Sequence, residues 1–233
     1  EELIRKLGES LSFRYAHQEA THAPSKQTAT QRKGRSKDSE AAEDSQEPRQ
    51  ITRSWRKPSF AGDRRQGKTY GSAVHAAMQY LRYGSCGSAG EIREELERLV
   101  SGQFLTREQA DLVNCDALAA FFGSEFGIKL RSGANYIREF KFSILDAGEH
   151  YGAGLEGERV LLQGVVDCAV LDHDGITVID FKTDNVTEGY LAEIVDRYRP
   201  QVQTYGEAMS RIFELPVKAS YLYFFRLNRF VKV

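Results

Sequence analysis

The segment "VIDFKTD", residues 178–184, places an aspartate and a lysine two positions apart, at Asp180 and Lys182, inside an apolar, β-branched run. Packing alone rarely puts two opposite charges inside a strand, because neither group contributes to an apolar core. Side chains repeat every two residues along a strand, so this carboxylate and this ammonium would share one face. The two residue types indicate chemistry such as metal binding and stabilisation of a transferring anion.

The preceding turn brings a second carboxylate to the same face. The residues "DHDG", 172–175, are typical of a turn between two strands. If these four residues form the loop, Leu171 pairs with Ile176, and the same register pairs Asp167 with Asp180. Directly opposed residues have Cβ atoms about 4.5–5.5 Å apart. The sequence thus predicts one patch that holds both carboxylates and the lysine ammonium.

Two opposed carboxylates repel each other, and their arrangement becomes favourable when a divalent cation lies between them. Hard oxygen ligands in a small cavity favour Mg²⁺. Lys182 would then stand beside a water that the ion activates, where it could lower the pKa of that water, hold it in line or stabilise charge on a phosphoryl group. The competing interpretation is a surface hairpin with solvated charges. The opposite strand faces are apolar, which favours the catalytic interpretation: Val166, Cys168, Ile179 and Phe181.

Four further positions are candidates for the same site. Gln201 and Tyr205 are four residues apart on a predicted helix, hence on one face, and both can reach phosphate oxygens or a base. The alternative for this pair is an ordinary polar helix edge. His75 lies among small residues in "GSAVHAAM", which leave room for a ligand, although a lone helical histidine can equally belong to a partly buried core. Glu139 in "IREFKF" carries little information by itself.

The periodicity of the chain predicts the elements that position these residues. Apolar residues at helical spacing predict helices over 70–83, 89–100, 106–127 and 190–213. Gly71 and Ser72 are expected to cap the first of these helices, and Thr106 the third, while Pro200 interrupts the last helix or opens a new first turn. Alternating runs predict strands over 136–145, 160–171, 175–183 and 217–225. Helices, a three-strand meander, then a helix and a strand predict an α/β fold with a mixed sheet flanked by helices.

The N-terminal part has a different composition. Residues 1–14 resemble the end of a helix, and residues 23–50 contain no aromatic residue and no Val, Ile, Leu or Met. Such a segment cannot bury enough apolar surface to offset its ordering entropy, so we expect a linker or a mobile surface loop. A basic tether that contacts DNA is the functional alternative. We therefore expect a helix end plus flexible linker over 1–54 and one folded domain over 55–233.

The totals set only broad bounds. The 233 residues are 41% hydrophobic and 11% aromatic, which is ordinary for a globular protein with a real core. The net charge of −1 argues neither for nor against nucleic acid. Three scattered cysteines without a CxxC pair fit a reducing cytoplasm, and no stretch reaches the roughly 20 apolar residues of a membrane helix. No signal peptide opens the chain. Because it begins at Glu1, we expect a fragment of a longer polypeptide or a processed one.

Taken together, the motifs resemble a known family. "GVVDCAVLDHDGITVIDFKTD" is similar to the Asp…Asp-x-Lys core of the RecB-like branch of the PD-(D/E)xK nucleases, which have a restriction-endonuclease-like fold. The branch also has an upstream helical histidine and a downstream Gln-x-x-x-Tyr, matched by His75 and by "QVQTY". The ordered set "GSAVHAAMQYL", "LTREQADLV", "REFKF", "YRPQVQTYGEAM" and "VKASYLYFF" resembles the nuclease domain of bacterial AddA-type helicase–nuclease proteins, from about Pro58 to the C-terminus.

The resemblance implies a role for each matching residue. His75, Asp167, Asp180 and the backbone carbonyl of Phe181 would hold the metal, which is Mg²⁺ or, as a substitute, Mn²⁺. Lys182 would be the catalytic lysine, and Glu139 would support the site through a water. Gln201 and Tyr205 would position DNA or the lysine. Arg197 and Arg199 are candidate phosphate binders, or else solvated helix charges.

On the same resemblance, the function would be exonuclease-type DNA hydrolysis in a cytoplasmic bacterial complex that processes double-strand breaks for recombinational repair. The partners would be single-stranded DNA from an unwound duplex end, a helicase portion of the same polypeptide and an AddB-type subunit. The four-cysteine pattern of iron–sulfur members and the GxxxxGK[ST] phosphate loop are absent, so we expect neither a cluster nor an ATP site here. The alternatives are an inactive nuclease-like module that binds DNA or another protein, and a hydrolase acting on RNA.

Overall fold

The computed structural model describes residues 2, 5, 25–30 and 62–233. The expected helix end at 1–14 and the expected domain boundary at residue 54 fall mostly or wholly outside these ranges. By their internal contacts the residues divide into two units, Glu1–Thr28 with Ser143–Gln163, and Ala29–Phe142 with Gly164–Val233. The candidate site lies entirely in the second unit.

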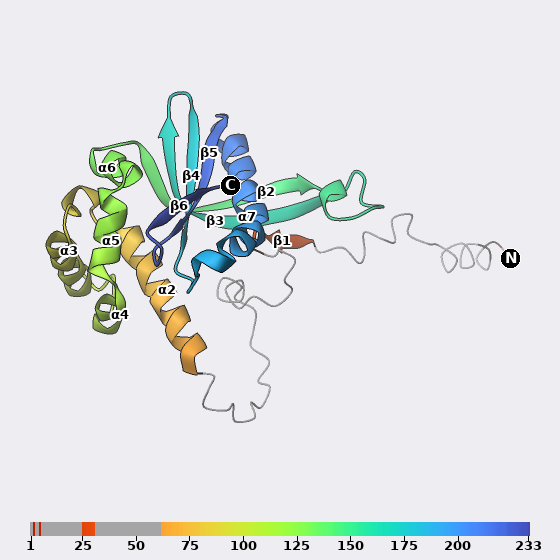
Figure 1. Cartoon of the computed structure of the whole chain (residues 1–233). Coiled ribbons are helices and arrows are strands. Elements are labelled where there is room, and N and C mark those ends of the chain that lie inside the picture. The colour runs from red at the N-terminus through yellow and green to blue at the C-terminus, as the bar shows by residue number, and fades with distance from the viewer. Residues whose placement is uncertain (1, 3–4, 6–24, 31–61) are drawn as a thin grey trace. The chain divides into compact units, whose positions relative to one another are not determined.

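Six helices and six strands follow one another in the described residues (Figure 1). The helices are α2 (Gly62–Tyr80), α3 (Ala89–Ser101), α4 (Arg107–Leu112), α5 (Cys115–Gly123), α6 (Glu125–Arg131) and α7 (Leu191–Phe213). The strands are β1 (Lys26–Thr28), β2 (Tyr136–Ala147), β3 (Arg159–Asp172), β4 (Gly175–Lys182), β5 (Val217–Phe224) and β6 (Arg229–Lys232).

The strands form one mixed sheet in the order β1-β3-β4-β5-β6, with β2 also pairing with β3. Neighbouring strands β3 and β4 are antiparallel, β4 and β5 are parallel, and β5 and β6 are antiparallel. Leu171 pairs with Ile176, as the turn motif predicts, and Asp172 also pairs with Gly175, so the loop shortens to two residues. The predicted α/β fold with a mixed central sheet and flanking helices is confirmed.

Each face of the second unit's sheet is covered by a different set of helices (Figure 1). Helix α7 packs on β4 and β5, where Leu222 and Phe224 join a buried cluster with Val202. The other face packs against α2 and α5, and it receives Ile179 and Phe181 from β4. Because side chains alternate along β4, Asp180 and Lys182 must point to the α7 side.

Helix boundaries differ from the predictions at several points. Helix α2 begins at Gly62, so Gly71 and Ser72 lie inside it instead of capping it. The predicted helix over 106–127 is three helices, because two polar caps start new ones. Asn114 accepts hydrogen bonds from the first backbone N–H groups of α5, and Ser124 does the same for α6. The predicted N-cap at Thr106 is confirmed, together with its capping-box partner Gln109.

Other corrections concern a proline and two short strands. Pro200 neither interrupts α7 nor opens a new helix, since the helix is continuous from Leu191 to Phe213. One missing N–H costs less than the packing that Val202 and Tyr205 gain, both being buried against the sheet. Strand β1 lies inside the segment expected to be a linker, where Lys26 to Thr28 pair with Leu161 to Gln163 of β3 in parallel. Strand β6 was not predicted.

A buried glutamate ties the end of α2 to α3. Glu95 is 7% exposed and accepts hydrogen bonds from the backbone N–H of Arg82 at 3.0 Å and from Arg98 Nε at 2.9 Å. Arg98 also donates to the carbonyl of Tyr80 at 3.1 Å, which satisfies an end of α2. The hydrogen bond from Arg98 holds the pKa of Glu95 below its ordinary value.

Glu95→Gln should therefore lower the free energy of unfolding by about 1–3 kcal/mol near neutral pH, because one charge-assisted acceptor is replaced by a donor group. The folded-state pKa is depressed, so the stabilisation is fully present above the ordinary value of 4.5 and is lost as pH falls through the folded-state value. Urea unfolding across this pH range measures it, with exposed Glu94→Gln as a matched control. A difference that stays constant down to strongly acidic pH would contradict the assignment.

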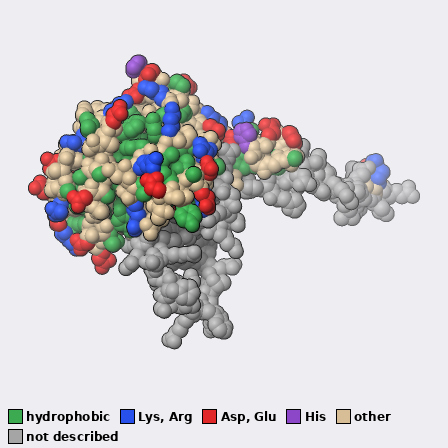
Figure 2. All heavy atoms as spheres, in the orientation of Figure 1, with side chains coloured by type: hydrophobic (Ala, Val, Ile, Leu, Met, Phe, Trp, Pro, Cys, Tyr) green, Lys and Arg blue, Asp and Glu red, His purple; other side chains and the backbone are tan. Residues whose placement is uncertain are grey.

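Among the described residues, no helix combines the length and apolar character needed to cross a membrane. On the face in Figure 2, acidic and basic side chains are interspersed over the described surface. Recognition of an anionic ligand on this face would then depend on local groups and not on one broad basic field.

Candidate active site

The ladder between β3 and β4 ends one step before the pair that the turn motif predicts. The last pair is Cys168 with Ile179, and Asp167 then uses its side chain. Its Oδ2 accepts a hydrogen bond from the backbone N–H of Phe181 at 2.7 Å. Because the carboxylate takes the place of a ladder carbonyl, the two strands part at this point. The structure thus brings the N–H of Phe181, and not its carbonyl, into contact with Asp167.

Three side chains from three elements converge where the strands part. His75 of α2 has its Nδ1 3.5 Å from Asp167 Oδ1 of β3 and 3.9 Å from Glu139 Oε1 of β2. One ligand atom of each residue lies within 4.8 Å of those of the other two. Burial lowers the pKa of His75, but the two carboxylates outweigh burial and raise this pKa well above its ordinary value. The cluster is therefore a place where negative charge accumulates.

Asp167 itself is held ionised. Its residue is 9% exposed, and burial raises the pKa of its carboxyl group. The imidazole of His75, the ammonium of Lys182 and the N–H of Phe181 together outweigh burial, so the pKa is lower than the ordinary value. A carboxylate that stays ionised while buried is suited to binding a cation.

Glu139 has an unusual backbone. Its φ is +47°, in the left-handed region, although it lies in the middle of strand β2. For a residue with a Cβ this conformation costs about 1–2 kcal/mol. Strain of this kind persists only where the surroundings impose it, and it is common at functional sites. Here it accompanies the approach of the Glu139 carboxylate to His75.

The other predicted acid forms a buried ion pair. Asp180 Oδ2 lies 2.7 Å from Lys182 Nζ, and the two residues are 2% and 8% exposed. Burial lowers the pKa of Lys182, but the nearby Asp180, Tyr198 and Asp167 outweigh it, so this pKa is raised. The ammonium is thus fixed as a cation. Both aspartates act on Lys182, which places them on its side of the sheet.

Helix α7 supplies the remaining contacts of the ammonium. Lys182 Nζ lies 3.9 Å from the centroid of the Tyr198 ring and 3.5 Å from Gln201 Oε1. Gln201 Nε2 donates to the hydroxyl of Tyr205 at 2.6 Å, and both residues are buried. A Cβ at Gly164 would lie 3.0 Å from the Tyr205 ring, so this glycine leaves room for it. The polar-edge alternative for Gln201 and Tyr205 is wrong.

The structure also shows what the sequence reasoning missed. Tyr198 precedes Gln201 by three residues and Tyr205 by seven, a helical spacing that could have marked it as a third member of the same face. Its hydroxyl donates to Asp184 Oδ2 at 3.1 Å, which fixes the ring under the lysine. The close approach of Glu139 to His75 was not predicted either.

Two predicted residues are not brought to the site. Arg197 donates to Glu193 at 3.3 Å and Arg199 to Asp196 at 3.1 Å, so both guanidinium groups pair within their own helix. Asp180 is not one of the three residues whose ligand atoms cluster, because its carboxylate lies against Lys182 instead. A role for Arg197 and Arg199 in phosphate binding stays a prediction.

Comparison with known proteins gives a consistent result. The sequence model described as "PD-(D/E)XK nuclease superfamily" matches residues 18–231. The chain is 31% identical over 235 residues to an AddA-type protein of Clostridium novyi (strain NT), the nuclease-bearing chain of an ATP-dependent helicase/nuclease, covering 98% of this chain and 19% of that protein. Proteins of the same name from Bacillus cereus (strain Q1) and Bacillus mycoides (strain KBAB4) are 33% and 32% identical over 237 residues, covering 96% of this chain and 19% of each relative.

The chain spans about a fifth of the length of these curated relatives. A solved structure described as "Crystal structure of SSO0001" is 14% identical over 75% of this chain and 78% of that chain, with a TM-score of 0.34, which is too low to support an inference. The similarity to AddA-type proteins, which five short motifs indicate, is confirmed over nearly the whole chain. Since the family match runs from residue 18 to residue 231, the chain belongs to the PD-(D/E)XK nuclease superfamily.

Proposed function

We propose that this chain is a divalent-metal-dependent nuclease domain that hydrolyses phosphodiester bonds of DNA. One observation carries the proposal: His75, Glu139 and Asp167 converge within 4.8 Å, and the electrostatic reach of the buried Asp180–Lys182 pair includes Asp167. A purely structural cluster would not need three carboxylates and one histidine around so little positive charge.

The donor set fits a divalent cation. Glu139, Asp167 and Asp180 carry three negative charges and Lys182 one positive charge, which leaves two negative charges in excess when His75 is neutral. Oxygen donors with one imidazole suit Mg²⁺ or Mn²⁺. The Phe181 carbonyl is a further candidate ligand. When bound, the ion supplies Lewis acidity toward the phosphodiester and lowers the pKa of a nearby water.

The side chains around the cluster perform the remaining tasks. Lys182 stabilises the negative charge that develops on the phosphoryl oxygens as water attacks phosphorus. Gln201 accepts from the ammonium, and Tyr205 holds the amide of Gln201 in this orientation. Burial first, and then the two aspartates, raise the pKa of Tyr205, so its hydroxyl stays protonated. The bond from phosphorus to O3′ breaks, which leaves a 5′-phosphate and a protonated 3′-hydroxyl.

Metal binding should be separable from turnover. Ca²⁺ should occupy the site and stabilise the fold, by about 2.7 kcal/mol at a concentration one hundred times its Kd. Only Mg²⁺ or Mn²⁺ should support hydrolysis of single-stranded DNA. Thermal unfolding with each ion and gel assays on labelled DNA measure both quantities. Robust cleavage in Ca²⁺ alone would contradict the scheme, and so would wild-type protein that no divalent ion stabilises.

Tyr198 should act through the lysine. Tyr198→Leu removes the ring under a buried ammonium, which is worth about 1–2 kcal/mol and so about 5- to 30-fold in the rate. Tyr198→Phe keeps the ring and loses only the hydroxyl bond to Asp184, so it should restore most of the rate. Single-turnover cleavage with Mg²⁺ compares the two variants. Equal losses in both would mean that the hydroxyl, and not the ring, matters.

The competing function is a nuclease-like module that binds DNA or another protein without cutting. It is not favoured, because Asp167, Asp180 and Lys182 are all present and the ammonium is held beside the acids. A Mg²⁺-stabilised protein that binds DNA but never cleaves it would support this alternative. The same assay with RNA tests the choice of sugar.

The larger setting follows from the relatives. We propose that the chain is the nuclease part of a longer helicase–nuclease polypeptide that works with an AddB-type subunit. Exonuclease-type digestion of unwound strands would then serve double-strand break repair in the bacterial cytoplasm. Co-purification of the full-length polypeptide with its AddB-type partner, followed by digestion of a linear duplex with ATP, tests this setting.

A further inference from the structure

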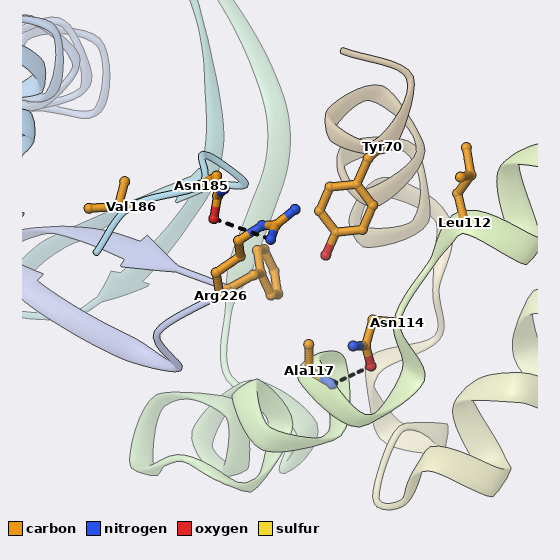
Figure 3. A pocket seen from close by; sticks show the side chains of 8 residues that line it. Tyr70, Leu112, Asn114, Ala117, Asn185, Val186 and Arg226 are labelled. Carbon is orange, nitrogen blue, oxygen red and sulfur yellow. Dashed lines mark hydrogen bonds between the residues drawn. The ribbon is translucent and has the colours of Figure 1, made fainter. Parts of the chain in front are cut away.

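A second cleft lies at the end of strand β4. Its volume is about 640 Å³, and its walls come from α2, the start of α5, the segment after β4 and the turn after β5 (Figure 3). The lining combines two aromatic rings, Tyr70 and Phe225, with the guanidinium of Arg226 and the amides of Asn114 and Asn185. This mixture suits a ligand with flat rings and negative charge more than an apolar one.

The cleft shares its walls with the candidate active site. Tyr70 lies five residues before His75 on α2, which is about 7.5 Å along the helix axis. The next residue, Gly71, approaches the chain after β4 so closely that a Cβ would lie 3.0 Å from Thr183 Oγ1. A ligand extending from the carboxylate cluster along α2 would therefore meet the Tyr70 ring.

The opposite wall is tied to the lysine strand. The backbone N–H of Phe225 donates to the carbonyl of Lys182 at 3.0 Å, which fixes the turn after β5. Arg226 follows in this turn and is exposed, and its Nη1 donates to Asn185 Oδ1 at 3.3 Å. In Figure 3 the Arg226 guanidinium points into the space between Asn185 and Tyr70.

The charge of Arg226 remains available to a ligand. Within the part of the chain that the structure describes, its guanidinium donates to a neutral amide and no carboxylate forms an ion pair with it. Burial raises the pKa of Tyr70, and the Arg226 guanidinium opposes this rise, which is consistent with the two groups facing one space. A guanidinium held by an amide keeps N–H groups for a phosphate.

We infer that this cleft binds the single-stranded nucleic-acid segment adjoining the phosphodiester under attack, with Arg226 on a phosphate and Tyr70 against a base. The inference rests on the proposed function, because it takes the carboxylate cluster as the reacting centre. Sites for single strands combine cationic groups that follow the backbone with rings on which bases stack. A peptide of a partner protein is the competing occupant, and the pairing of a ring with an arginine favours the nucleotide.

The test measures binding without turnover in the 233-residue chain. Fluorescence anisotropy follows a labelled short oligothymidylate with Ca²⁺ in place of Mg²⁺, over a range of salt concentrations. Arg226→Gln should weaken binding and make the slope of log K against log salt shallower by about 0.7, the value for one phosphate contact on a single strand. Tyr70→Leu should weaken binding about tenfold, whereas Tyr70→Phe should bind like the wild type.

Arg93→Gln, on the exposed face of α3, is the matched control for the loss of one positive charge, and thermal unfolding checks that each variant is folded. Slopes and affinities of Arg226→Gln and Tyr70→Leu equal to those of the control would overturn the inference and leave the cleft to a protein partner. A wild-type chain that does not bind the oligonucleotide would overturn it as well. If the binding pattern appears but Mg²⁺ never supports cleavage, the proposed function fails and the nucleic-acid cleft stands.

Discussion

Asp180→Asn should reduce Mg²⁺-dependent hydrolysis of single-stranded DNA by on the order of 10³-fold or more, because it removes charge both from the metal site and from beside the lysine. The change is isosteric, so the backbone of β4 is expected to remain in place. It nevertheless leaves the buried ammonium of Lys182 without its closest partner, at 2.7 Å in the wild type. Breaking such a pair costs about 3–5 kcal/mol when the remaining charge cannot relax.

The rate loss and the stability loss must therefore be measured together. Single-turnover cleavage gives the first, and urea unfolding monitored by circular dichroism gives the second. Asp111→Asn, the same chemical change at an exposed position of α4, is the matched control and should alter neither quantity appreciably. If Asp180→Asn stays folded and cleaves DNA at the wild-type rate, Asp180 has no part in the reaction, and cleavage by the wild type would point to a contaminant.

Lys182→Met should lower the hydrolysis rate by about 10²- to 10³-fold while leaving metal binding intact or tighter. The methionine fills the space of the lysine stem without its charge. With the competing cation removed, Asp167 and Asp180 are free to turn all of their negative charge toward a divalent ion. Ca²⁺ should consequently raise the unfolding temperature of Lys182→Met by more than it raises that of the wild type.

This outcome separates the two variants, since Asp180→Asn should lose both turnover and part of the stabilisation by Ca²⁺. Thermal unfolding at several Ca²⁺ concentrations, alongside the cleavage assay, distinguishes them. Should Lys182→Met lose its response to Ca²⁺ as well as its activity, the lysine would have to be a support of the metal site and not a group that acts on the substrate.

Local signals explain the parts of the fold that the sequence predicts well. The register of β3 and β4 follows from a two-residue alternation and a turn motif that lie close together in the chain. Local signals also compete, which explains the division of 106–127: its apolar pattern is helical throughout, but Asn114 and Ser124 each offer a cap that ends one helix and starts the next. Strand β1 carries no apolar signal, because Lys26 to Thr28 are defined by their pairing with a distant strand.

The site divides in the same way. The prediction that Asp167, Asp180 and Lys182 share a side of the sheet needs only strand geometry, and the structure brings these groups together. The contacts of Glu139 and Tyr198 depend on how β2 and α7 approach the sheet, which no short motif encodes. The preference of Asp180 for Lys182 over the histidine cluster depends on side-chain conformation in a buried space.

The left-handed backbone of Glu139 has a consequence for any attempt to improve this protein. Glycine tolerates a φ of +47° without the clash that a Cβ creates, and Glu139→Gly would also remove one of two acids crowded around His75. Heat-resistance screens that ignore turnover would therefore tend to favour the loss of this side chain. Durability and catalytic competence pull in opposite directions at this position, so a selection scheme has to score both.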